Sequence, residues 1–180
     1  MWAELAVLFG VLALGQSSPG PDLLLVTRTA VARGRAAGWW TALGISTGLC
    51  VHAALAIGGV SVLFAQGGWL ATGLRWAAAG YLGWLGYQLC VASFIAFYSG
   101  VKYEGTGAVP EDGALACWRR GLLCNVLNLK VALFFAGVLA PFLQGDRPGW
   151  WPVLLWGVLV GEGLLLWALW VWVLQFKPIR

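Results

Sequence analysis

Charge is scarce in this chain. Only 10% of its 180 residues are charged and 61% are hydrophobic, whereas soluble domains carry roughly 25% charged residues. This composition excludes an ordinary soluble globular domain. The net charge of +4 comes without the basic face and aromatic platforms of a soluble nucleic-acid-binding domain, so we predict no nucleic-acid partner.

Metal-ligating and catalytic patterns are also lacking. Cys50, Cys90, Cys117 and Cys124 show no metal-site spacing and fall mostly in apolar segments, where thiols pack as small hydrophobic groups. Around the single histidine, His52, there is no Ser-His-Asp, Cys-His or histidine-rich constellation. We therefore predict no enzyme, no catalytic residue, no metal site and no cofactor.

Long apolar segments are what the sequence does contain. A helix needs about 20 mostly apolar residues to cross a bilayer. Five segments meet this requirement, at residues 2–26, 39–64, 69–95, 121–143 and 150–176. The predicted fold is all-α, a polytopic bundle of about five transmembrane helices that forms a single transmembrane domain over residues 1–180.

A polar loop at residues 99–118 divides this domain into a first three-helix half, residues 1–98, and a second half, residues 119–180. Basic residues in short loops stay in the cytoplasm. Those on one side of the predicted spans are Arg28, Arg33, Arg35, Lys102, Arg119, Arg120, Lys177 and Arg180. The other side carries Arg147 alone. We expect the N-terminus outside, and the loop and the C-terminus in the cytoplasm.

A run of polar and helix-breaking residues, from Ser17 to Asp22, interrupts the first span. Lipid offers no hydrogen bonds to freed backbone groups, so such a break is tolerated only where it is buried in protein or lines a cavity. Pro19, Gly20 and Pro21 are predicted to open the helix, and its free N–H and C=O groups would hold the polar part of a transported solute.

A second polar interruption, Asn125 to Lys130, lies in the fourth span, which crosses in the opposite direction. This is the relation between corresponding helices of inverted three-helix repeats. Asn125 and Asn128 are predicted polar ligands. Asp22 is placed where it could meet Lys130, either as a charge pair that substrate opens or as a purely structural pair.

Two further ionisable residues lie near the middle of the bilayer by helix rise. Glu162 is either a proton carrier or a satisfied structural acid. His52 is either a ligand or a neutral ring hydrogen-bonded between helices. Small residues at Gly44 and Gly48 predict close helix packing, within the chain or in a homodimer.

Several motifs together resemble the LysE/RhtB family of bacterial amino-acid exporters. They are Ser18-Pro-Gly-Pro-Asp-Leu-Leu-Leu-Val-Thr-Arg28, Arg33-Gly-Arg-Ala-Ala-Gly38, Gly44-Ile-Ser-Thr-Gly-Leu-Cys-Val-His52, and Arg120-Gly-Leu-Leu-Cys-Asn-Val-Leu-Asn-Leu-Lys130 followed by Ala132-Leu-Phe-Phe135. The match covers most of residues 5–143.

The resemblance implies a six-helix inner-membrane exporter of amino acids or close derivatives, coupled to the proton gradient. The family's Pro-Gly-Pro-Asp falls on residues 19–22, and its Asn-Pro-Lys falls on Asn128, Leu129 and Lys130. Leucine permits a continuous helix where proline would not, so the sequence does not decide whether the second break forms. Compared with the family's six spans, we expect no further span after residue 176 and therefore an incomplete second half.

We therefore predict a proton-coupled amino-acid export permease whose partners are the lipid bilayer, an amino-acid-like solute and protons. One half of the bundle would rock against the other. The predicted substrate and ion site comprises Pro19, Gly20, Pro21, Asp22, Asn125, Asn128, Lys130, Glu162 and His52. The alternative is a non-transporting or incomplete membrane protein that acts as a scaffold or needs a partner subunit.

Overall fold

The computed structural model describes residues 2–66 and 113–175, with isolated positions between 68 and 94. Within these residues the chain is helical and has no strand. The helices are α1 (Trp2–Gln16), α2 (Pro21–Arg33), α3 (Arg35–Gln66), α5 (Ala114–Val126), α6 (Leu129–Leu139) and α7 (Trp151–Val173). The predicted all-α architecture is confirmed.

The lengths of these helices suit a membrane bundle. Among the described residues, two helical stretches are long and apolar enough to span a bilayer, Arg35–Gly59 of α3 and the whole of α7. Helices α5 and α6 meet the same criterion as one span bent by 57°. Many large apolar side chains on the outside of the bundle are exposed, as expected where lipid is the solvent.

The predicted span boundaries agree only in part. The third predicted span, 69–95, and most of the loop 99–118 lie outside the described residues. The predicted fourth span, 121–143, falls on α5 and α6, and the helix that contains its start begins earlier, at Ala114, after the extended residue Gly113. Residues 114–118, predicted as loop, are therefore helical.

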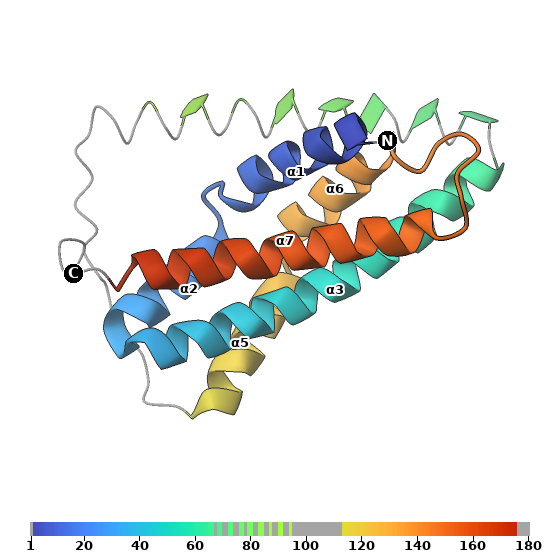
Figure 1. Ribbon diagram of the computed structural model, residues 1–180. Helices are drawn as coiled ribbons and strands as arrows, with labels where there is room; N and C mark the ends of the chain where they lie inside the picture. The colour runs from blue at the N-terminus through green and yellow to red at the C-terminus, as the bar shows by residue number, and fades with distance from the viewer. Residues whose placement is uncertain are drawn as a thin grey trace.

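Helix α3 is at the centre of the bundle and contacts α2, α5, α6 and α7. Figure 1 shows α3 and α7 side by side and antiparallel, with α1 beside α7 and α5 on the far side of α3. The buried core draws on α1, α2, α3, α6 and α7. Between α2 and α3 the chain turns at Gly34 alone, whose φ of 82° favours glycine.

Helices α3 and α5 approach each other backbone to backbone. A methyl group added at Gly44 would overlap the carbonyl oxygen of Trp118, and one added at Gly121 would overlap the carbonyl oxygen of Thr41. Gly48 lies in the same way against the side chain of Asn125. The predicted close packing of Gly44 and Gly48 thus occurs within the chain.

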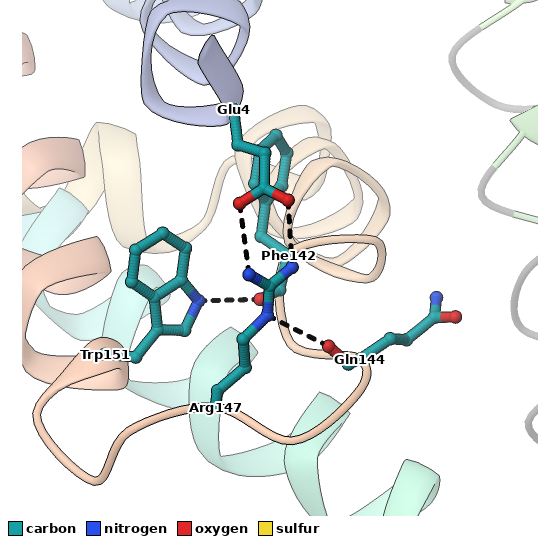
Figure 2. Close-up of polar contacts among 5 residues, drawn as sticks. All are labelled: Glu4, Phe142, Gln144, Arg147 and Trp151. Atoms are coloured by element: carbon teal, nitrogen blue, oxygen red, sulfur yellow. Dashed lines mark hydrogen bonds and ion pairs between the residues drawn. The ribbon is translucent and has the colours of Figure 1, made fainter. Parts of the chain in front are cut away.

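At one end of the bundle, α1 is tied to the segment between α6 and α7 (Figure 2). The Arg147 guanidinium donates two hydrogen bonds to the Glu4 carboxylate, from Nη1 at 3.1 Å and from Nη2 at 3.2 Å. It also lies 5.1 Å from the ring centroid of Trp151, whose Nε1 donates to the Phe142 carbonyl at 2.7 Å. These contacts fasten the start of the chain to its second half.

Candidate functional site

The first helix break lies where the Pro-Gly-Pro run predicts it. Helix α1 ends at Gln16, and the Ser18 hydroxyl donates to the Gly15 carbonyl at 2.7 Å, which closes the helix end. Pro21 opens α2, a position where its fixed φ suits the helix and its missing N–H costs nothing. Asp22 follows in the first turn, at the positive end of the helix dipole.

Lys130 satisfies the carbonyl groups that this break sets free. Its Nζ donates to the Ser18 carbonyl at 3.1 Å and to the Pro19 carbonyl at 3.2 Å, and it also contacts the Ser18 hydroxyl. A side chain at Gly20 would begin 3.2 Å from this Nζ, so the missing side chain leaves room for the ammonium group. The backbone of the first break is therefore bound by a cation from the second half.

The Asp22 carboxylate also links the two breaks. Here a residue of the first break accepts hydrogen bonds from residues of the second. Only 6% of this residue is exposed. Its Oδ2 accepts hydrogen bonds from Asn125 Nδ2 at 2.8 Å and from Asn128 Nδ2 at 3.1 Å. Its Oδ1 is buried and has no hydrogen-bond partner among the described residues. That oxygen is a buried acceptor whose hydrogen-bonding capacity is unused by the described residues.

The second break forms without the proline that the resemblance associates with it. Helix α5 ends at Val126, and α6 begins at Leu129. The Asn128 side chain caps α6 by accepting from the Lys130 backbone N–H at 3.1 Å, which is the usual N-cap bond. Asn128 N–H in turn donates to the Asn125 carbonyl at 2.9 Å. The break is therefore made by the Asn128 cap, with Leu129 in the position of the proline.

His52 supports this second break from α3. Its Nε2 donates to the Asn125 carbonyl at 2.9 Å, and the residue is 8% exposed. Of the two predicted roles, the observed contact is the hydrogen bond between helices. His52 thus positions Asn125, which holds the Asp22 carboxylate.

A small cavity of about 30 Å³ lies between the two breaks, close to one water molecule's share of liquid volume. We call it the polar cavity. Its walls are Gly15, Gln16, Ser18, Gly20, Asp22, Leu23, Leu49, Asn128, Lys130, Val131, Phe134, Phe135 and Trp167. Four of the predicted residues line it directly: Gly20, Asp22, Asn128 and Lys130. The two opposite charges therefore share one enclosure.

The other predicted residues lie around this cavity or away from its walls. Pro19 and Pro21 shape the break, and Asn125 and His52 act through Asp22 and Asn125 respectively. Glu162 is 2% exposed on α7 and does not line the polar cavity. Both of its carboxyl oxygens are buried without a hydrogen-bond partner among the described residues.

Gln16 and Trp167 were not predicted as site residues, yet both line the polar cavity. The amide atoms of Gln16 and the Nε1 of Trp167 are buried without a hydrogen-bond partner among the described residues. Gln16 stands directly before the polar run, so its position was a usable signal. Trp167 is one of 13 tryptophans, and nothing in the sequence distinguishes it from the others.

The comparison with protein families agrees with this architecture. The model described as "LysE type translocator" matches residues 13–176. The chain belongs to the LysE type translocator family. The resemblance that the motifs carry is confirmed, and the paired helix breaks described above belong to a LysE type chain. No solved structure matches it.

Several curated relatives are similar over most of this LysE type chain. A threonine efflux protein of Escherichia coli (strain K12) is 33% identical over 136 residues, 73% of this chain and 62% of that protein. One of Salmonella typhimurium is 32% identical over 135 residues, with the same coverage. The uncharacterized membrane protein YrhP of Bacillus subtilis is 28% identical over 128 residues, 70% of this chain and 61% of that protein. The chain thus spans less than two thirds of the length of these relatives.

Proposed function

We propose that this chain is an inner-membrane export permease for amino acids or close derivatives. The observation that carries the proposal is the meeting of two helix breaks around a cavity that holds one carboxylate, Asp22, and one ammonium, Lys130. A zwitterionic solute carries the complementary pair of charges. The similarity to threonine efflux proteins supports an amino-acid solute without fixing which one.

The contacts suggest how such a solute would be held. Its ammonium group would bind Asp22 Oδ1, which has no hydrogen-bond partner among the described residues, while Asn125 and Asn128 keep Oδ2 in place. Its carboxylate would draw Lys130 away from the Ser18 and Pro19 carbonyls. Binding therefore exchanges an internal set of hydrogen bonds for a ligand-bound set, which links the solute to the packing of the two breaks.

Proton coupling is the second part of the proposal. Glu162 is the leading carrier, because a buried carboxyl group without a hydrogen-bond partner is far less costly as a neutral acid than as an anion. Asp22 is the other carrier, since it lies in the solute site itself. The proposed orientation has the N-terminus outside and the C-terminus in the cytoplasm, and the asymmetry of basic residues between the two sides supports it.

The solute site is tested by efflux from bacterial cells that express the chain and are preloaded with a panel of amino acids. Asp22→Asn and Lys130→Ala, matched to wild type for membrane abundance, should each abolish selective efflux. Asp146→Asn removes an exposed carboxylate between α6 and α7 and serves as the control, with efflux unchanged. Export by this chain alone is refuted if wild type releases no amino acid faster than the empty vector.

Coupling is tested by imposing a pH gradient on vesicles that contain the protein. Wild-type efflux should accelerate when the acidic side is the side toward which amino acid is exported. Glu162→Gln should lose this acceleration but retain exchange of unlabelled for labelled solute, which needs no net proton movement. If Glu162→Gln responds to the gradient as wild type does, Glu162 is not the carrier.

A further inference from the structure

A second and larger cavity lies directly beside the polar cavity. It has a volume of about 260 Å³ and lies between the end of α1, the start of α2 and the C-terminal part of α7. We call it the apolar cavity. Gln16, Leu23 and Trp167 line both cavities, so these three side chains form the partition between them.

The two cavities differ sharply in chemistry. The apolar cavity is walled by Leu166, Leu169, Trp170 and Val173 beyond the shared partition, and Ser17 is its one further polar residue. Charged residues line only the polar cavity. A ligand that occupies both must be charged at one end and apolar at the other.

The partition itself carries polar groups that lack partners. Trp167 is 5% exposed, and its Nε1–H is buried without an acceptor among the described residues. The amide nitrogen and oxygen of Gln16 are also buried without a hydrogen-bond partner among the described residues. Buried polar groups are nearly always hydrogen-bonded, and the exceptions call for a missing partner. Two donors and one acceptor at the partition suit the carboxylate and ammonium of an amino acid that extends across it.

From these observations, and resting on the proposed function, we infer that the exported solutes are neutral amino acids with large apolar side chains. The charged groups lie in the polar cavity, the side chain fills the apolar cavity, and Gln16 and Trp167 hydrogen-bond the solute at the partition. A volume of about 260 Å³ corresponds to roughly eight or nine water-sized groups. That number is close to the seven non-hydrogen atoms of the phenylalanine side chain. Leucine, with four such atoms, fits the apolar walls by its chemistry, whereas the hydroxyl of threonine does not.

The size of the apolar cavity is tested with Leu166→Trp, which fills it from α7. Cells that express the full chain are preloaded with leucine, phenylalanine, alanine or threonine, and initial efflux rates are compared. We expect wild type to favour leucine and phenylalanine over alanine by about tenfold or more. Leu166→Trp should remove that preference and leave alanine efflux within about twofold.

Leu165→Trp is the matched control. It makes the same change on the same helix, but Leu165 is 68% exposed and lines neither cavity. It should export like wild type. Equal effects of the two tryptophans would overturn the inference and would point to lipid as the occupant of the apolar cavity.

The hydrogen bond at the partition is tested with Trp167→Phe, which keeps an aromatic ring but removes the N–H. The internal phenylalanine concentration that gives half-maximal efflux should rise about tenfold, with little change in maximal rate. Trp156→Phe is the control, because the Trp156 Nε1 already donates to the Cys50 carbonyl at 3.2 Å. Identical behaviour of both variants would overturn the role given to Trp167.

The outcomes separate the two proposals. If wild type exports alanine or threonine but not leucine or phenylalanine, and Asp22→Asn stops that export, then amino-acid export stands and the side-chain assignment is wrong. If no amino acid leaves faster than from empty-vector cells, both proposals fail.

Discussion

The two helix breaks produce the same kind of opening by different chemistry. Between α1 and α2 the break is made by proline and glycine, which act through their own backbone geometry. Between α5 and α6 no proline is present, and the break depends on an asparagine cap and on contacts from α2 and α3. The first break is therefore specified locally, whereas the second exists only when the helices around it are packed. Changes in packing should damage the second break first.

The largest expected effect comes from Gly48→Ala. The added methyl group would overlap the side-chain amide of Asn125 and lie 2.8 Å from its Cβ, so the residue that holds Asp22 must move. Overpacking of this kind costs about 1–3 kcal/mol of unfolding free energy. Unfolding of the purified protein in detergent measures the loss.

Gly58→Ala is the matched control on the same helix, because nothing lies within 4 Å of a methyl group at that position. It should leave stability unchanged or raise it by up to about 1 kcal/mol, since alanine favours helices. A similar loss for both alanines would show that the contact with Asn125 is unimportant.

A smaller loss is expected from Asn128→Ala. The change removes the cap on the Lys130 N–H and one of the two hydrogen bonds to Asp22 Oδ2. Loss of a cap and a buried hydrogen bond costs about 1–2 kcal/mol. Thermal unfolding and amino-acid efflux should both fall.

The counterpart of Asn128→Ala at the first break is Ser18→Ala. It removes the hydroxyl that bonds the Gly15 carbonyl and contacts Lys130, but it leaves the prolines that make the break. Its effect on unfolding should be the smaller of the two. An equal or greater loss for Ser18→Ala would contradict the distinction between a locally specified break and one that depends on packing.

A small gain is expected from Leu129→Pro. Leu129 is the first residue of α6, where proline is favoured, and Asn128 before it is already extended at φ −81° and ψ 95°, as a residue before proline must be. Stability should rise by about 0.4–1 kcal/mol, because the unfolded chain loses freedom. Leu133→Pro, inside the same helix, should instead cost about 3 kcal/mol. A loss at both positions would mean that the break at residue 129 is not preformed.

The smallest effect belongs to the opposite end of the bundle. Glu4→Gln removes the ion pair with Arg147. The Glu4 side chain is 40% exposed and the Arg147 side chain is 29% exposed. Exposed ion pairs contribute little and are screened by salt. The melting temperature should fall slightly at low salt, and the difference from wild type should vanish at about 1 M salt, where the Debye length is about 3 Å. A difference that persists at high salt would point to packing rather than charge.

The parts of the site that were predictable from the sequence are those with local causes. Pro19, Gly20 and Pro21 break the first helix wherever the rest of the chain lies, and a charge at bilayer depth marks Asp22 and Lys130 as functional candidates. Whether the second helix is broken could not be decided from the sequence, because Leu129 alone does not specify a break. Its cause is tertiary, in the contacts of Asp22 and His52 with residues more than seventy positions away.

The partition residues escaped prediction for a similar reason. A glutamine or tryptophan in an apolar segment becomes informative only when its polar atoms are seen to be buried without partners. The start of α5 at Ala114 was missed because the prediction followed apolar length, whereas the first turns of α5 carry Arg119 and Arg120.

The contacts at Gly44 and Gly121 constrain how the molecule can move. They join α3, from the predicted first half, to α5, which runs from the end of the predicted loop 99–118 into the predicted second half. In both cases a glycine of one helix rests on a carbonyl oxygen of the other. Where two backbones are in direct contact, no side chains lie between them that could change rotamer and let the helices slide. We therefore expect α3 and α5 to move together as one rigid body. Any rocking of one half against the other in the proposed transport cycle would then have to keep this pair of helices together.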